Sequence, residues 1–198
     1  MPERRPLMRK LILASRSIAR RNLLRQMGLD FRVVPSNARE SRRIGRSCAD
    51  LVIKNALRKA RDVAGRRPSS VVVGADTVVY AGNRIIGKPR SIQDAARTLK
   101  FLSKRPQWVY SGIAVVDAAT GREYTAFEKT KVLMYPLSDR QIMRYFSKVS
   151  PLDKAGSFDI QGMGGIFIDR IEGCFYNVVG LPLAKLAKLL RKTGIMTP

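Results

Sequence analysis

An aspartate stands in the middle of an otherwise apolar stretch, VVVGADTVVY at residues 71–80. Three valines before Gly74 and two after Thr77 are typical of buried strands. A buried carboxylate has to be paired, protonated or bound to a metal, because an isolated charge is costly to remove from water. Asp76 is therefore the first candidate for chemistry, and Gly74 and Ala75 beside it are small enough to let a ligand approach.

Lys59 is the most suitable partner for that carboxylate. Residues 47–64 have the pattern of an amphipathic helix, and Lys59 falls on its apolar face instead of its polar stripe. A lysine in that position either extends its ammonium group to the surface or meets a negative group. The second alternative predicts contact with Asp76 or with a phosphate.

The chain contains no histidine, which restricts the chemistry further. Ser-His-Asp and Cys-His nucleophiles and His-ligated metals are excluded. Proton transfer then depends on carboxylates, Lys, Tyr or metal-bound water, and oxygen ligands favour Mg²⁺ or Mn²⁺ as the metal. Cys48 and Cys174 lack metal-ligand spacing and are expected to be reduced core thiols.

Three further segments have the composition of anion-binding sites. LASRSIARRNLL at 13–24 places hydroxyls and arginines at a helix start, where free N–H groups favour an anion, although a solvated surface helix explains the same residues. GKP at 87–89 presents Lys88 in a tight turn, which also suits a solvated lysine. PLDKAGSFDIQGMGG at 151–165 combines glycines that allow close backbone approach with Gln161, whose amide can recognise a base edge.

The elements that position these residues alternate between short apolar runs and amphipathic segments, which predicts an α/β fold. Strands are expected at 10–14, 31–34, 70–73, 78–80, 85–86, 109–117, 124–134 and 166–171. Helices are expected at 18–27, 47–64, 91–102, 138–147 and 182–194. Asp76 then lies at a strand end. One domain is expected over residues 1–198, with residues 1–9 as a flexible N-terminal extension.

The strong positive charge is the unusual feature of the composition. Thirty-eight Lys and Arg against 15 Asp and Glu give +23, and a field of that sign attracts polyanions. The cations are spread along the chain and only 7% of residues are aromatic, which favours a generally basic surface over dedicated nucleic-acid binding. No apolar run reaches the length of a membrane span and the N-terminus lacks a signal-peptide pattern, so we expect a cytoplasmic protein without a membrane partner.

Taken in order, these motifs resemble the Maf family of nucleoside triphosphate pyrophosphatases. The matching segments are LASRSIARRNLL, Glu40 after VVPSN, ALRKA at 56–60, GADTVV at 74–79, GKP, LDKAGSFDIQGMG at 152–164 and NVVGLPL at 177–183. The resemblance implies the inosine-triphosphate-pyrophosphatase-like fold: an elongated, twisted mixed β-sheet flanked by helices, with a deep central cleft. It also implies hydrolysis of a nucleoside triphosphate to the monophosphate and pyrophosphate with a divalent cation, and a homodimer.

The resemblance also implies roles for individual residues. Glu40, Lys59, Asp76 and Lys88 match catalytic positions, with Asp76 as the proton acceptor and Glu40 and Asp76 as ligands of Mg²⁺ or Mn²⁺. The positions that match substrate contacts are Ser15, Ala19, Arg20, Thr77 and Gln161. Asp-Thr at 76–77 with Gln161 resembles the dTTP/UTP subfamily, whereas a sister subfamily acting on 7-methyl-GTP tends to have Asp-Gln and Glu there.

The chain departs from the family pattern at four positions. Ala19 replaces an Arg at a position that differs between subfamilies, Gln107 stands where His is common, Lys104 where Gly is common, and Ser150 where Glu often stands. Two alternatives therefore stay open. One is the same hydrolysis of another base, such as 7-methyl-GTP, and the other is a nucleic-acid-binding protein that keeps the scaffold without catalysis.

Overall fold

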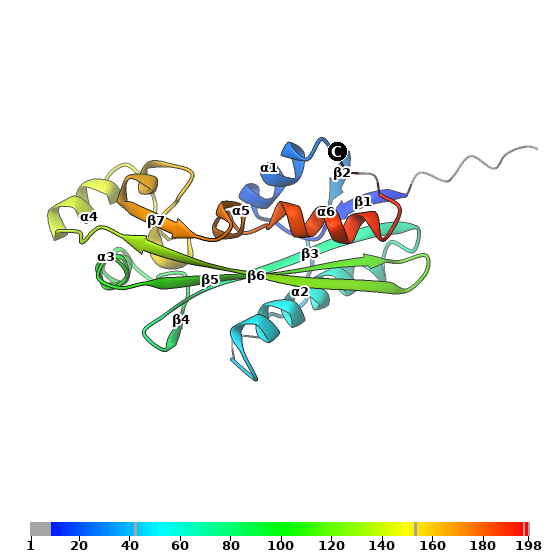
Figure 1. The fold of residues 1–198 in the computed structure, drawn as a ribbon, viewed down its shortest axis with the longest axis horizontal. Helices are drawn as coiled ribbons and strands as arrows, with labels where there is room; N and C mark the ends of the chain where they lie inside the picture. Colours follow the sequence, from blue (N-terminus) through cyan, green and yellow to red (C-terminus); the bar gives the residue numbers. More distant parts are fainter. Residues whose placement is uncertain (1–8, 42, 153, 196, 198) are drawn as a thin grey trace, which may run out of the picture.

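A single mixed sheet of seven strands forms the centre of the molecule (Figure 1). The structure is a computed structural model and describes residues 9–41, 43–152, 154–195 and 197. The strand order is β2-β1-β3-β5-β6-β7, with β4 paired to β3. The strands are β1 (Lys10–Leu13), β2 (Phe31–Val33), β3 (Ser70–Ala81), β4 (Arg84–Ile86), β5 (Gln107–Asp117), β6 (Arg122–Met134) and β7 (Ile168–Glu172). The expected α/β class with a mixed sheet is confirmed.

Helices cover both faces of this sheet. They are α1 (Ile18–Gln26), α2 (Cys48–Ala64), α3 (Ile92–Leu102), α4 (Asp139–Phe146), α5 (Phe175–Val179) and α6 (Leu183–Arg191), with short 3-10 turns η1 (Ala155–Ser157) and η2 (Met163–Phe167). In Figure 1, α2 lies below the sheet, while α1, α5 and α6 lie above it. The short helix α5 was not expected from the sequence. Along the described chain, no helix is both long and apolar enough to cross a bilayer.

Four helices begin directly after a serine that caps them. The hydroxyls of Ser17, Ser47, Ser91 and Ser138 each accept a hydrogen bond from the backbone N–H three residues later. Such a cap satisfies one of the N–H groups that a helix start leaves without a partner. These serines are the reason that the helix starts could be predicted from the sequence.

The N-terminal extension and the cysteines differ in part from expectation. Residues 1–8 of the expected extension lie outside the described residues, and Arg9, its last residue, forms an ion pair with Asp117. Both cysteines are free thiols, as expected. Cys48 is buried, but Cys174 is only half-buried, so the prediction of two core thiols is wrong for Cys174.

Strand β3 corrects the prediction that the chain leaves the sheet before Asp76. It continues without a break from Ser70 to Ala81. On one edge, β1 pairs only with residues 70–73 and β4 only with residues 79–81. That edge of β3 therefore has no strand neighbour between Gly74 and Val78. Asp76 lies in the middle of a strand, at a gap in the sheet, and not at a strand end.

Two glycines bring α2 onto the sheet at this gap. A Cβ on Gly74 would lie 2.2 Å from the Ala56 carbonyl oxygen, and one on Gly112 would lie 2.3 Å from the Val52 carbonyl group. Gly112 is the β5 partner of Asp76. Only glycine permits so close a contact between a helix and a sheet backbone. The space beside Gly74 is taken by α2, so the prediction that this glycine admits a ligand is wrong.

The gap also separates two hydrophobic cores on the opposite face. Ala75 belongs to a core that includes Leu23 of α1 and Leu186 of α6. Val79 belongs to a second core built with α3 and α4. Side chains at alternate strand positions share a face, so Thr77 points between the two cores. A hollow at Thr77 follows from this arrangement.

Candidate active site

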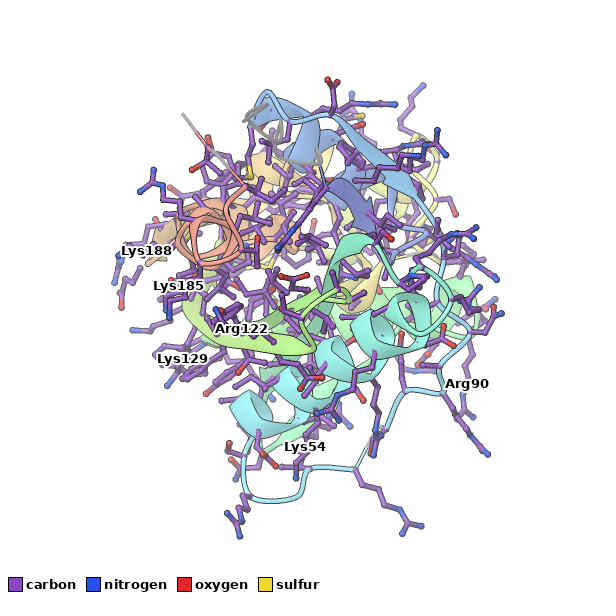
Figure 2. The ribbon with its side chains drawn as sticks, turned by 90° about the vertical axis from the view of Figure 1, so that its right-hand side faces the viewer. Lys54, Arg90, Arg122, Lys129, Lys185 and Lys188 are labelled. Atoms are coloured by element: carbon purple, nitrogen blue, oxygen red, sulfur yellow. The ribbon has the colours of Figure 1, made fainter. Side chains whose placement is uncertain are left out.

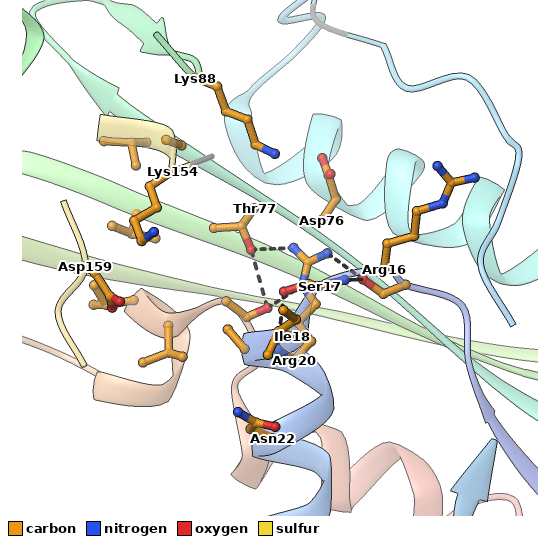
Figure 3. Close-up of a pocket in the computed structure, with 18 of the residues that line it drawn as sticks. Arg16, Ser17, Ile18, Arg20, Asn22, Asp76, Thr77, Lys88, Lys154 and Asp159 are labelled. Carbon is orange, nitrogen blue, oxygen red and sulfur yellow. Dashed lines mark hydrogen bonds between the residues drawn. The ribbon is translucent and has the colours of Figure 1, made fainter. Parts of the chain in front are cut away.

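A cleft of about 1100 Å³ opens beside β3, at the gap in the sheet between β1 and β4 (Figure 3). Its lining includes every site residue expected from the sequence: Ser15, Ala19, Arg20, Glu40, Lys59, Asp76, Thr77, Lys88 and Gln161. Pockets of about 300–1,000 Å³ hold ligands of drug or cofactor size, so this cleft has room for a nucleotide. The chain thus brings together residues that span almost 150 positions in the sequence.

Two carboxylates and one ammonium group form the floor of the cleft. Lys59 Nζ lies 2.8 Å from Asp76 Oδ1 and 2.7 Å from Glu40 Oε1. Lys59 also donates to the Ala75 carbonyl oxygen, which has no strand partner at the gap. The lysine and the aspartate are buried, while the Glu40 side chain is 53% exposed. The ion pair predicted from the position of Lys59 on its helix is therefore confirmed.

Asn55 completes the surroundings of Asp76. Its Nδ2 donates to Asp76 Oδ2 at 2.9 Å, so each carboxylate oxygen accepts one hydrogen bond from α2. Asn55 is 2% exposed and lies one helical turn before Lys59. Sequence analysis did not identify it as a site residue. The signal that identified Lys59, a polar side chain on the apolar face of α2, applies equally to Asn55.

Arg20 lines the cleft and donates hydrogen bonds to several groups around it. Its guanidinium donates to the carbonyl oxygens of Ala75 and Gly180, to Thr77 Oγ1 and to Ser15 Oγ, at 3.0 to 3.4 Å. Burial lowers the pKa of Arg20, whereas the nearby Asp76 and Glu40 raise it. Four of the five N–H donors of a guanidinium are used in this way, so at most one stays available to a ligand. Arg20 mainly ties α1 and the turn after α5 to the gap in β3.

Thr77 belongs to the same network. Its hydroxyl lies 3.0 Å from Arg20 Nη2 and 2.8 Å from Ser111 Oγ. A hydroxyl has one donor and two acceptor sites, so these contacts occupy most of its capacity. The Thr77 hydroxyl therefore has little capacity left for a hydrogen bond to a ligand, and the expected contact of Thr77 with the base stays a prediction.

Cations surround the opening of the cleft. Figure 3 shows Lys88 from the loop after β4, Lys154 from the segment before η1 and Arg16 from the turn before α1. Within the described residues, Lys88 and Arg16 have no ion-pair partner, and both are exposed. Sequence analysis identified Lys88 but passed over Arg16, which stands inside the Ser-rich turn and gave no signal of its own. The Lys88 ammonium group and the Arg16 guanidinium group can therefore bind an anionic ligand without first breaking an ion pair.

Gln161 lines the cleft from the segment between η1 and η2. Its backbone N–H donates to Asp159 Oδ1 at 3.0 Å, an Asx-type turn that fixes the chain at this point. The side chain of Gln161 is exposed. The turn therefore holds the backbone of Gln161 while leaving its amide accessible at the cleft wall.

The departures from the family pattern lie in different surroundings. Ala19 lines the cleft, where it leaves space and removes one cation. Gln107 is fully buried at the start of β5, and neither of its amide atoms has a hydrogen-bond partner in the described part of the chain. Ser150 and Lys104 are exposed, and neither belongs to the cleft lining. Only the Ala19 departure acts directly on the cleft.

Comparison with known proteins agrees with this geometry. The profile of the family described as "Maf-like protein" matches residues 10–193. The chain belongs to the Maf family. Among curated relatives, the "dTTP/UTP pyrophosphatase" of Pelotomaculum thermopropionicum is 43% identical over 94% of this chain and 98% of its own length. The protein with the same name from Acetivibrio thermocellus is 45% identical, covering 94% and 96%.

A solved structure extends the likeness to the fold. The HAM1 protein from Coxiella burnetii aligns with a TM-score of 0.52 over 93% of this chain and 100% of its own, at 13% identity. At that identity the likeness concerns the fold alone. The Maf chain therefore has the sheet and helix arrangement that its motifs led us to expect.

Proposed function

We propose that this Maf protein hydrolyses dTTP and UTP to the nucleoside monophosphate and pyrophosphate. The observation that carries the proposal is the cluster of Lys59, Asp76 and Glu40 at the floor of a cleft. Lys88 and Arg16 line the same cleft, and neither has an ion-pair partner among the residues that the structure describes. The names of relatives that are 40–45% identical over nearly the whole chain support the choice of nucleotide.

In the proposed reaction, a water molecule attacks the α-phosphorus. The bond between that phosphorus and the oxygen bridging to the β-phosphate breaks, and pyrophosphate leaves. Asp76 takes the proton from the water, because each of its oxygens already accepts one hydrogen bond but keeps a second lone pair. The leaving pyrophosphate carries negative charge, which Lys88 and Arg16 neutralise at the rim.

The carboxylates also fit a divalent cation. Mg²⁺ commonly binds one or two carboxylates and takes its remaining oxygens from phosphates and water. Glu40 and Asp76 supply that number, and both already face one positive charge, that of Lys59. No cluster of three or more metal-binding side chains occurs among residues that the structure describes, and the further ligands of such an ion would come from substrate phosphates and water. When bound, Mg²⁺ or Mn²⁺ polarises the phosphate and acidifies water.

Incubation with a nucleotide panel tests the proposal directly. The panel contains dTTP, UTP, CTP, dATP, GTP and 7-methyl-GTP with Mg²⁺ or Mn²⁺, and the products are measured as pyrophosphate and monophosphate. We expect dTTP and UTP to turn over fastest, and the Asp76→Asn variant to turn over none of them, because an amide keeps the shape but accepts no proton. If 7-methyl-GTP is hydrolysed faster than dTTP and UTP, the proposed substrate changes to 7-methyl-GTP. The replacement of the family Arg by Ala19 would then be the sequence feature that indicated this substrate.

Nucleic-acid binding is the alternative that the +23 charge favours. Figure 2 labels cations from separate parts of the fold, and they come from α2 (Lys54), the loop after β4 (Arg90), β6 (Arg122, Lys129) and α6 (Lys185, Lys188). Two of them form ion pairs, Lys54 with Asp50 and Lys185 with Glu128. A dispersed surface of this kind supports general basicity over a dedicated groove. Absence of turnover together with steeply salt-dependent RNA or DNA binding would establish the alternative.

We further propose that the protein forms a homodimer in the cytoplasm, as the family resemblance implies. Analytical ultracentrifugation tests the first point through the mass of the sedimenting species, about twice the 22.2 kDa of one chain. Cell fractionation tests the second. A monomer across micromolar concentrations would remove the dimer from the proposal without affecting the hydrolysis.

A further inference from the structure

The loop that carries Glu40 has no regular secondary structure in its described part. Residues 34–47 connect β2 to α2, and those of them that the structure describes lie in no helix or strand. Near its start, the Asn37 N–H donates to Asp62 Oδ2 at 2.9 Å, but this contact is exposed and lies three residues before Glu40. The Glu40 side chain is half exposed and forms an ion pair with Lys59 at the floor of the cleft. The contact of this loop that lies nearest to Asp76 is made by its backbone at Ser41.

The side chain of Asn55 provides that contact. Its Oδ1 accepts from the Ser41 N–H, and its Nδ2 donates to the Ser41 carbonyl oxygen, both at 2.9 Å. The same Nδ2 donates its second hydrogen to Asp76 Oδ2 at 2.9 Å. The orientation of the amide is fixed by these partners, because only an oxygen can accept from Ser41 N–H and only a nitrogen can donate to a carboxylate.

These contacts close a ring around the floor of the cleft. Ser41 follows Glu40 in the chain, Asn55 joins Ser41 to Asp76, and Lys59 joins Asp76 back to Glu40. The two joins differ in kind. Lys59 contributes ion pairs with Asp76 and Glu40. A metal ion competes with Lys59 for the carboxylates, and a phosphate group competes with the carboxylates for Lys59. Asn55 itself carries no charge, is 2% exposed and uses both of its amide donors, so it presents no charge of its own for which a ligand competes.

We propose that Asn55 is a positioning residue for the reaction, which holds the Glu40 loop against Asp76 while charged groups enter and leave the cleft. The proposal rests on the hydrolysis proposed above and adds a residue to it. Only a carboxamide fulfils this role here. A leucine would leave Ser41 and Asp76 without partners, and an aspartate would keep the acceptor for Ser41 N–H but lose both donors and set a third carboxylate beside the other two.

Two variants and one control test the proposal. Asn55→Ala removes all three hydrogen bonds, and Asn55→Asp keeps the shape and one of them. Ser103→Ala is the control, because Ser103 is equally buried and bonds Lys100 and Leu137, none of which lines the cleft. Hydrogen exchange of a peptide covering residues 37–45, thermal unfolding, and kcat and KM for UTP are measured for all four proteins.

We expect both Asn55 variants to speed the amide exchange of this peptide about tenfold or more, while Ser103→Ala leaves it unchanged. We also expect kcat to fall roughly 100-fold with KM changed by less than about threefold, since small misplacements of reacting groups act on the chemical step. Asn55→Asp should lose at least as much kcat as Asn55→Ala despite its native shape.

Other outcomes overturn the proposal. Unchanged exchange at residues 37–45 means that Asn55 does not hold the loop. Faster exchange with a kcat within about threefold of wild type means that the loop position does not matter to the reaction, and the Asn55 contacts serve stability alone, as those of Ser103 do. If the wild-type protein hydrolyses no nucleotide, the proposed function fails, whereas the exchange measurement still decides whether Asn55 holds the loop.

Discussion

Replacing Lys59 by methionine tests whether the charge cluster is arranged as the structure has it. Methionine is similar in length to lysine and packs well at the apolar face of α2. The substitution removes the only cation that contacts Asp76 within the described structure, and leaves that carboxylate with a single hydrogen bond, from Asn55. Asp76 is 6% exposed, so water at the cleft floor replaces the lost partner incompletely.

The size of the effect follows from the burial of the two ion pairs. Breaking a buried pair by removing one partner costs about 3–5 kcal/mol, because the other charge stays buried alone. The contact between Lys59 and Glu40 adds little, since the glutamate side chain is 53% exposed and exposed pairs contribute about 0–1 kcal/mol. For a domain of this size, each 1 kcal/mol lowers the Tm by about 2–4 °C, so the Tm of Lys59→Met should fall by roughly 6–20 °C.

The double variant Lys59→Met with Asp76→Asn separates charge from packing. It removes both charges while Asn55 can still donate to the amide oxygen at position 76. We expect it to be more stable than Lys59→Met by about 2 kcal/mol, measured by thermal and urea unfolding, while neither variant hydrolyses UTP. The reasoning fails if Lys59→Met melts within about 2 °C of wild type, or if the double variant is no more stable than Lys59→Met.

Three further predictions concern other parts of the chain. Gln161→Glu should change the ranking of nucleotides more than the overall rate, and an unchanged ranking in the panel would remove Gln161 as the base contact. Gln107→Leu should raise the Tm, because it removes two buried amide atoms without partners; a lower Tm would instead indicate a buried water that pairs them. The hydrogen bond from Arg61 holds the pKa of Glu123 below its ordinary value of 4.5, so this pair stabilises the fold above about pH 4.5 and loses its effect as the pH falls through the lowered pKa. The stability difference between wild type and Glu123→Gln should therefore be small and constant near neutral pH and shrink in acid.

Much of the cleft could be predicted from local sequence. The serine caps marked the helix starts, and the position of Lys59 on its helix indicated a buried negative partner before any contact was known. The prediction failed where the cause is not local. The chain around Asp76 looked like a strand end because glycine and aspartate disfavour strands. The structure resolves the conflict through the neighbouring strands and through α2, whose contacts at Gly74 no sequence pattern reveals.

The continuous strand has a consequence for the chemistry that a strand end would not have. The backbone of β3 is paired with β5 before, at and after Asp76, and Gly112, the β5 partner of Asp76, packs closely against α2. A carboxylate on a loop would have to be ordered each time a substrate binds, at a cost in entropy, whereas Asp76 is held before binding. Glu40, in contrast, stands on a loop, which contacts the rest of the site through Asn55, Asp62 and Lys59. The chain thus combines a carboxylate fixed in the sheet with a carboxylate on a loop, and the variants at Lys59 and Asn55 act on the two contacts that join them.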